Sequence, residues 1–282
     1  MAPADIASRS LRFGAVLMLG LATGIGASTS AKAEKLRLGN EGVFPPFSMV
    51  DSDGTVKGVE PDLAREMCKR MNVECEIQVM DFKALVPSLT QGKFDVLISQ
   101  LLQTTERRQR MTLTRRLFTN PSTFVVPKSS SYTFTKEGLK GKGMKLGLQK
   151  GGANAKWVQE QFGDSIEYVF YDNPDQMKLD LLAGRVNALV MLKINAATQI
   201  LMKPEGKDWK LDGGEHNIGQ DDIPESERGL TWAVRKGEDA LVKRLDAALT
   251  SIINDCTYTT IRKKYLETTT LPEDAACIAR GM

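Results

Sequence analysis

The chain has 282 residues, of which 41% are hydrophobic and 26% charged, a composition typical of a globular protein long enough to bury a large core. This composition excludes a disordered chain, a collagen-like repeat and a coiled coil. Thirty-eight Lys and Arg against 35 Asp and Glu give a formal net charge of +3 without a long run of like charges, so we expect no nucleic-acid partner. The one histidine, His216, lies in a polar stretch that predicts an exposed loop, and no His/Cys/Asp cluster has ligand spacing, so we expect no metal site and no cofactor.

The N-terminal segment has the pattern of a secretory signal peptide. Arg9 and Arg12 precede an apolar stretch over residues 13–27, and Ala31-Lys32-Ala33 has the small-x-small form of a cleavage site. The alternative is a membrane anchor, but four glycines interrupt the stretch, which is shorter than the roughly 20 apolar residues of a spanning helix. We therefore expect residues 1–33 to be removed during export.

The four cysteines are compatible with two disulfides, because an exported chain meets an oxidising compartment. Cys68 and Cys75 lie seven residues apart, between a predicted helix and the next strand, whereas Cys256 and Cys277 flank a C-terminal helical segment. Pairing each cysteine with its neighbour in the sequence is the economical arrangement. The two other pairings remain open at this stage.

Hydrophobic periodicity predicts alternating strands and helices in the first part of the exported chain. Leucines at every second position mark the first strand, whereas apolar residues at steps of three and four mark the first helix. The expected elements are a strand over 35–39, a proline-containing loop over 44–47, a helix of about three turns with Pro61 at its first position, a strand over 76–80, a helix from Asp81 to Gly92 kinked at Pro87, and a buried strand over 96–98.

The second part repeats this order of elements. The expected elements are a strand over 144–149, a glycine-containing turn over 150–154, a helix over 155–162 that ends at Gly163, a helix capped by Asn173 with Pro174 first, a buried strand over 188–190, a strand over 230–234 and a helix over about 238–254. The strand-helix alternation predicts an α/β fold.

Two segments of the chain match each other at an offset of 92 residues. Residues 91–98 and 183–190 each run from a helix end through a glycine and a basic residue into a buried strand, so we expect two similar α/β lobes. The last strand and helix are too short for a third lobe. We therefore predict one lobe from residues 34–120 and 222–282, and a second from residues 121–221, with the chain crossings near 119–121 and 220–224. A ligand would lie between the lobes, at the carboxyl ends of their strands.

Six motifs in this order resemble one protein family. They are Leu36-Arg37-Leu38-Gly39 to Phe44-Pro45-Pro46-Phe47, Gly58-Val59-Glu60-Pro61-Asp62-Leu63, the segment 81–89, Gly92-Lys93-Phe94-Asp95-Val96-Leu97-Ile98, Thr104-Thr105-Glu106-Arg107-Arg108 and Ala233-Val234-Arg235-Lys236-Gly237. The chain resembles the family 3 extracellular solute-binding proteins, the polar amino-acid receptors of bacterial ABC importers, and within them the branch that binds lysine, arginine, ornithine, histidine and opines. That branch also carries a cysteine pair like Cys68 and Cys75.

The resemblance implies a periplasmic binding protein and not an enzyme. Two lobes would close on a small carboxylate-containing solute, and the monomer would deliver it to an ABC transporter permease in the inner membrane. Arg107 matches the arginine that holds the ligand carboxylate, which suits a guanidinium because it grips carboxylate with two hydrogen bonds. Phe44 and Phe82 match the aromatic residues on either side of the ligand side chain. Glu41 matches an acid that faces the distal cation of the ligand, and Ser99 matches a first-lobe position whose backbone contacts the ligand.

The chain departs from the family pattern at several site positions. Where the receptors usually have a small or hydroxyl residue and then a Ser or Thr, this chain has Gln100 and Leu102. In the second lobe, after Gln149 at a strand end, Gly152-Ala153 replaces the usual Ser/Thr-Thr, and Asn154 follows. We expect Gln100, Leu102, Gln149, Ala153 and Asn154 to contact the ligand.

The most informative departure is Leu192, which aligns with the acid that pairs with the ligand α-ammonium. A buried ammonium beside leucine would be costly, so we expect a carboxylate ligand whose α-nitrogen is absent or substituted, such as an opine. The first alternative is an ordinary lysine, arginine or histidine receptor. Further alternatives are a periplasmic dehydratase of the same fold and a binding protein that reports to a signalling receptor.

Overall fold

The computed structural model describes residues 34–281, so the predicted signal peptide lies outside the described residues. Two five-stranded sheets and a small three-stranded sheet organise this part of the chain. Between residues 34 and 281, no helix combines the length and the apolar character needed to cross a membrane. We call the first five-stranded sheet with its helices the first lobe, and the second sheet with its helices the second lobe.

The first sheet has the strand order β5-β1-β6-β13-β7. Its strands are β1 (Lys35–Asn40), β5 (Glu74–Val79), β6 (Val96–Leu102), β7 (Met111–Leu113) and β13 (Leu230–Arg235). Strand β1 runs parallel to β5 and β6, whereas β13 pairs antiparallel with β6 and β7. The C-terminal part of the chain therefore returns to the first sheet.

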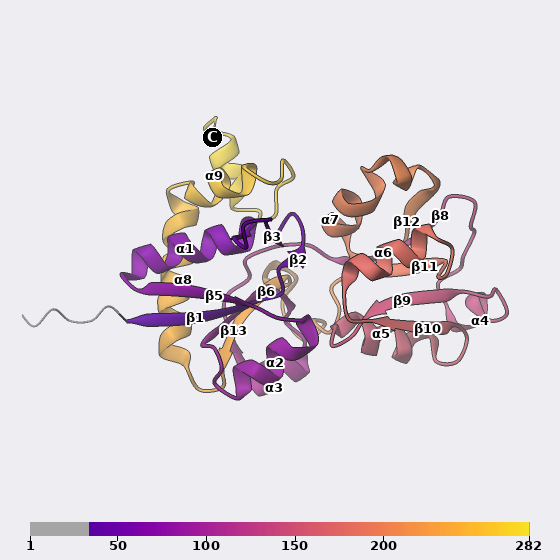
Figure 1. The fold of residues 1–282 in the computed structure, drawn as a ribbon, viewed down its shortest axis with the longest axis horizontal. Helices are drawn as coiled ribbons and strands as arrows, with labels where there is room; N and C mark the ends of the chain where they lie inside the picture. Colours follow the sequence, from indigo (N-terminus) through magenta and orange to yellow (C-terminus); the bar gives the residue numbers. More distant parts are fainter. Residues whose placement is uncertain (1–33, 282) are drawn as a thin grey trace, which may run out of the picture. The chain divides into compact units, whose positions relative to one another are not determined.

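Helices cover both faces of this sheet (Figure 1). They are α1 (Val59–Met71), α2 (Phe82–Thr90), α3 (Thr105–Arg110), α8 (Asp239–Asn254), α9 (Thr257–Lys263) and α10 (Asp274–Ile278), with a short 3₁₀ turn at Glu225–Glu227. Successive side chains of a strand point to opposite faces: Ile98 packs with α1 and α8, and Leu97 packs with α2.

The second sheet has the order β10-β9-β11-β8-β12. Its strands are β8 (Ser122–Pro127), β9 (Lys145–Gln149), β10 (Glu167–Tyr171), β11 (Ala188–Leu192) and β12 (Trp209–His216). The helices are α4 (Lys136–Leu139), α5 (Ala153–Phe162), α6 (Pro174–Leu182) and α7 (Lys193–Ala196), followed by a π-helical turn (Ala197–Leu201) and a 3₁₀ turn (Pro204–Asp208). Val158 of α5 packs with one face of the sheet and Leu181 of α6 with the other.

Three local predictions need correction. The loop around Pro45 and Pro46 is flanked by short paired strands, β2 (Val43–Phe44) and β3 (Ser48–Val50), which form a small sheet with β4 (Val56–Lys57); the prolines occupy only the turn. Helix α1 begins at Val59 and not at Pro61, because loop carbonyls accept the first helical N–H groups. His216 ends a strand and packs 4.6 Å from Trp157 between ring centroids.

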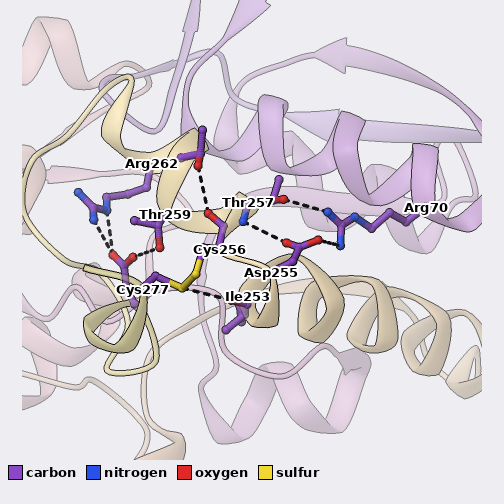
Figure 2. Close-up of a disulfide and its surroundings, with 10 residues drawn as sticks. Arg70, Ile253, Asp255, Cys256, Thr257, Thr259, Arg262 and Cys277 are labelled. Atoms are coloured by element: carbon purple, nitrogen blue, oxygen red, sulfur yellow. Dashed lines mark hydrogen bonds and ion pairs between the residues drawn. A yellow bond between two sulfur atoms is a disulfide. The ribbon is translucent and has the colours of Figure 1, made fainter. Parts of the chain in front are cut away.

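Both disulfides have the local pairing, Cys68 with Cys75 and Cys256 with Cys277. Figure 2 shows the second of them beside a fully buried ion pair, in which Arg262 Nη2 lies 2.8 Å from Asp274 Oδ2. The disulfide and the ion pair both join α9 to α10. Together they fix the C-terminal segment onto the first lobe.

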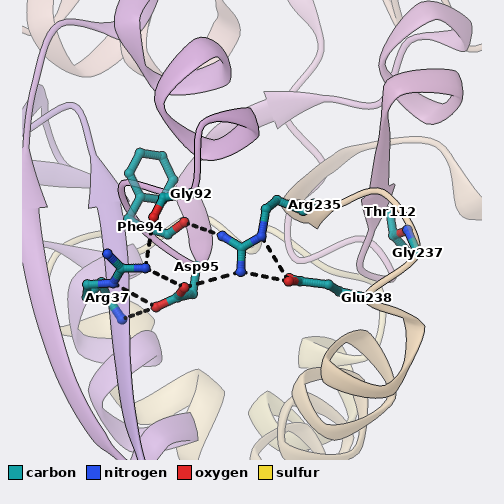
Figure 3. Close-up of polar contacts among 8 residues, drawn as sticks. All are labelled: Arg37, Gly92, Phe94, Asp95, Thr112, Arg235, Gly237 and Glu238. Atoms are coloured by element: carbon teal, nitrogen blue, oxygen red, sulfur yellow. Dashed lines mark hydrogen bonds and ion pairs between the residues drawn. The ribbon is translucent and has the colours of Figure 1, made fainter.

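An ion-pair network joins three strands of the first sheet away from the carboxyl ends of β1 and β6 (Figure 3). Asp95, just before β6, accepts hydrogen bonds from Arg37 of β1 at 2.8 Å and from Arg235 of β13 at 3.3 Å. Arg235 also donates to Glu238 at 2.9 Å. Since these contacts lie at the amino end of β6, the opposite end is left for the site.

Candidate ligand-binding site

All eleven side chains that the sequence predicts as ligand contacts line one cavity between the lobes, which we call the inner cavity. They are Glu41, Phe44, Phe82, Ser99, Gln100, Leu102, Arg107, Gln149, Ala153, Asn154 and Leu192. The remaining lining residues, not predicted, are Gly152, Met177, Val190 and Met191. That the eleven residues contact a ligand remains a prediction.

The carboxyl ends of β1 and β6 supply much of the first-lobe wall. Asn40 ends β1, which places Glu41 at the edge of the sheet, and Ser99 to Leu102 complete the buried strand β6. The next helix, α3, begins after Thr104, whose hydroxyl accepts from the Arg107 N–H at 3.3 Å. This cap places Arg107 in the first turn of α3, beside the cavity.

The Arg107 guanidinium is a half-buried cation without an acidic ion-pair partner among the described residues. Its Nη1 donates to Leu102 O at 2.9 Å and its Nη2 to Gly151 O at 3.2 Å, and it lies 5.8 Å from the centre of the Phe82 ring. Burial lowers the pKa of Arg107 to about 10. Within residues 34–281 no carboxylate forms an ion pair with Arg107, so its remaining N–H groups are suited to a ligand anion.

Glu41 is the opposite case, a buried acid without a cationic partner among the described residues. Its side chain is 4% exposed and accepts a hydrogen bond from Gln149 Nε2 of the second lobe. Burial is the main reason that the pKa of Glu41 is raised to about 8; the bond from Gln149 lowers it, and the nearby Asp81 adds a smaller increase. A cation brought into the cavity would stabilise the charged form.

A second buried acid, Glu60, lies behind the cavity wall. Its Oε1 accepts from Gln100 N at 2.8 Å and from Trp232 Nε1 at 3.0 Å, and burial raises its pKa to about 8. Sequence analysis noted Glu60 only as part of a motif. The acid supports the backbone of β6 where the strand borders the cavity.

An amide network joins the two lobes beside Gln100. Asn120 Nδ2 donates to Gln100 Oε1 at 3.2 Å and to Asn195 Oδ1 at 3.0 Å, while Asn120 Oδ1 accepts from the backbone N–H of Ile194 at 2.9 Å. Asn195 Nδ2 donates in turn to Pro45 O at 3.2 Å. All three amides are buried, and sequence analysis identified only Gln100.

The second-lobe wall is mostly apolar. Met177 of α6 and the end of β11, including Leu192, contribute hydrophobic side chains. The polar residues of this wall are already engaged, because Gln149 donates to Glu41 and Asn154 Oδ1 accepts from Ser122 Oγ at 2.9 Å. Among the described residues that line the inner cavity, Glu41 is the only acidic side chain and Arg107 the only cationic side chain.

Two ion pairs cross between the lobes outside the inner cavity. Lys83 Nζ lies 2.6 Å from Asp172 Oδ1, and Lys156 Nζ lies 3.3 Å from Glu106 Oε2. These side chains are largely exposed, so solvent screens both pairs and each adds little to stability. Asp172 also pairs with Lys150 of its own lobe at 3.1 Å.

Comparison with known proteins identifies the family. The model of the bacterial extracellular solute-binding proteins, family 3, matches residues 36–268. The histidine-binding periplasmic protein of Escherichia coli (strain K12) is 33% identical over 265 residues, covering 89% of this chain and 96% of that protein. The lysine/arginine/ornithine-binding periplasmic protein of the same strain is 32% identical over 252 residues, covering 89% and 94%.

A solved structure agrees with this match. An ancestral arginine-binding protein bound to arginine superposes with a TM-score of 0.72 at 31% identity, covering 82% of this chain and 97% of the other. The two α/β sheets, their flanking helices and the cavity between them are those of a two-lobe binding protein. The chain belongs to the bacterial extracellular solute-binding proteins of family 3.

Proposed function

We propose that this protein is the periplasmic receptor of an ABC importer for a small solute of the basic amino-acid class. The observation that carries the proposal is the pair of opposite charges on the inner cavity, neither of which has an ionic partner in the described part of the chain. In this proposal Arg107 binds the solute carboxylate and Glu41 its distal cation. Phe44 and Phe82 line the space between them.

The relatives support this class of solute. Their names specify histidine, or lysine, arginine and ornithine, and the similar solved structure holds arginine. These names favour the cationic amino-acid alternative of the sequence analysis over an opine. They also support the periplasmic location, since the named relatives are periplasmic. The export signal and the permease partner remain part of the proposal.

A second candidate is a basic amino-acid derivative without a free α-ammonium. Leu192 favours it, because the apolar wall around this residue offers no carboxylate to a second cation. A solute with one carboxylate and one cation would match Arg107 and Glu41, whereas free arginine or lysine brings a further ammonium. Transfer of an unpaired charge into such surroundings is unfavourable.

We infer binding without catalysis as the role of the cavity. General acid-base catalysis requires groups positioned on the reacting atoms, and the proposed solute contacts already employ both ionisable side chains of the wall. Incubation with prephenate or arogenate should leave these compounds unchanged. Steady product formation would instead favour the dehydratase alternative.

Calorimetric titration tests the proposal. Protein purified from a bacterium expressing the full chain would be unfolded and refolded to remove carried ligand, then titrated with arginine, lysine, histidine and 5-guanidinopentanoate. Arg107→Met and Glu41→Gln should each weaken binding by about 100-fold, as expected for a buried charged contact. Arg110→Met, which removes an exposed charge on the same helix, is the matched control and should not change affinity. Equal affinities for all four proteins would contradict the proposal.

A further inference from the structure

Residues outside the inner cavity determine which way the side-chain amide of Gln100 points. A backbone N–H can only donate, so the bond from Ile194 N requires an oxygen at Asn120 Oδ1 and places Nδ2 on the opposite side. Asn120 Nδ2 then faces Gln100, which must present its oxygen. The oxygen of Gln100 is therefore used by Asn120.

The other end of this amide is a donor without an acceptor. Gln100 lines the inner cavity and is 7% exposed, and its Nε2 is buried without a hydrogen-bond partner among residues 34–281. A buried donor without a partner is unfavourable and is rare in folded proteins. A bound solute that offers an oxygen would satisfy it.

The remaining polar groups of the cavity define what that solute carries. If Arg107 binds the carboxylate and Glu41 the distal cation, a third polar group of the solute meets the apolar wall, the Ser99 hydroxyl and the Gln100 donor. An ammonium there would have no counter-ion and would face another N–H donor. An oxygen acceptor would complete the hydrogen bonding of the wall.

We propose that Gln100 selects a basic solute whose α-position carries an oxygen acceptor in place of a free ammonium, either the carbonyl of an N-acyl group or an α-hydroxyl or α-keto oxygen. This inference rests on the proposed function, because Arg107 and Glu41 must first occupy the two ends of the solute. It adds a specificity residue and a chemical class that those two charges do not determine.

Four probes with one guanidinium and one carboxylate separate the possibilities. They are arginine, Nα-acetylarginine, the 2-hydroxy analogue of arginine, and 5-guanidinopentanoate, which has no α-substituent. At least one of the two oxygen-bearing probes should bind about tenfold more tightly than 5-guanidinopentanoate, and arginine should bind more weakly than all three. Tightest binding of arginine would overturn the inference while leaving the proposed function intact.

Substitutions at Gln100 provide the second measurement. Gln100→Glu keeps an oxygen for Asn120 and replaces the free donor by an oxygen, so the preference should shift at least tenfold toward arginine. Gln100→Met removes the donor and should abolish the advantage of the oxygen-bearing probe over 5-guanidinopentanoate. An unchanged order of affinities in both variants would overturn the inference.

The matched control is Gln220→Met. Gln220 is fully buried and its Nε2 also has no partner in the described part of the chain, but it does not line the cavity. This variant should keep the order of the four affinities even if its melting temperature falls. Absence of binding of all four probes, and of lysine and histidine, to the parent protein would refute the proposed function itself.

Discussion

Binding of a cationic solute should release a proton from Glu41, and the affinity should therefore rise with pH. The pKa of Glu41 is about 8 without ligand, so most of this carboxyl is protonated at pH 6, whereas the bound cation requires the carboxylate. Ionising it at pH 6 costs about 3 kcal/mol, which corresponds to an affinity about 100-fold lower than the limit above pH 8. The dependence should level off above pH 8.

Titration calorimetry in buffers of different ionisation enthalpy measures this effect directly. At pH 6.5 we expect release of nearly one proton per solute bound, falling toward zero at pH 9. The Glu41→Gln variant should bind more weakly and show no dependence. Glu60→Gln replaces a buried acid that does not line the cavity and is the control; it should keep the same dependence, because the pKa of Glu41 is raised by burial and by Asp81 and not by Glu60. An affinity that is constant from pH 6 to 8 would refute the reasoning.

Three further predictions concern stability in denaturant unfolding. Asp274→Ala should lower the free energy of unfolding by about 3–5 kcal/mol, because it leaves the Arg262 cation buried without its partner; an effect below 1 kcal/mol would contradict a buried pair. Replacing Cys256 and Cys277 together by Ser should cost about 3 kcal/mol, from the entropy of a loop of 21 residues, and an unchanged midpoint would argue against this disulfide. Burial keeps Glu60 neutral in the folded protein, with a pKa raised from 4.5 to about 8. The folded protein is therefore most stable relative to the unfolded chain below pH 4.5, and this stability is lost as the pH rises through 8. Glu60→Gln should therefore gain stability over the parent protein by a few kcal/mol between pH 5 and 8, and a constant difference would exclude this origin.

Much of the fold could be predicted because local patterns determine its elements, and most of the cavity lining could be predicted from the family resemblance. Alternating leucines mark β1, and the continuous apolar run at Val96–Ile98 marks β6, so a polar residue just after either strand lies at a sheet edge. Asn173 and Pro174 similarly begin α6, where the Asn173 side chain accepts from Asp175 N at 2.7 Å. Such signals depend on residues close in the sequence.

The remaining site features depend on residues far apart in the sequence. An acid in the first turn of a helix is usually exposed, and nothing near Glu60 indicates that Trp232 supplies a donor 172 positions later. Asn120 meets Asn195 across the lobes in the same way. The sequence shows that Gln100 differs from the family pattern, but the direction of its amide depends on these tertiary contacts.

The amide network gives the chain a route to new specificity that leaves the cavity lining unchanged. Asn120 does not line the cavity, yet its Nδ2 determines which end of the Gln100 amide is free. In Asn120→Asp the side chain could only accept, so the Gln100 amide would turn over and present its oxygen to the solute. One nucleotide change outside the cavity could thus exchange a donor for an acceptor inside it. When such receptors evolve, residues that contact the cavity lining from behind would then determine the bound solute as much as the lining residues do.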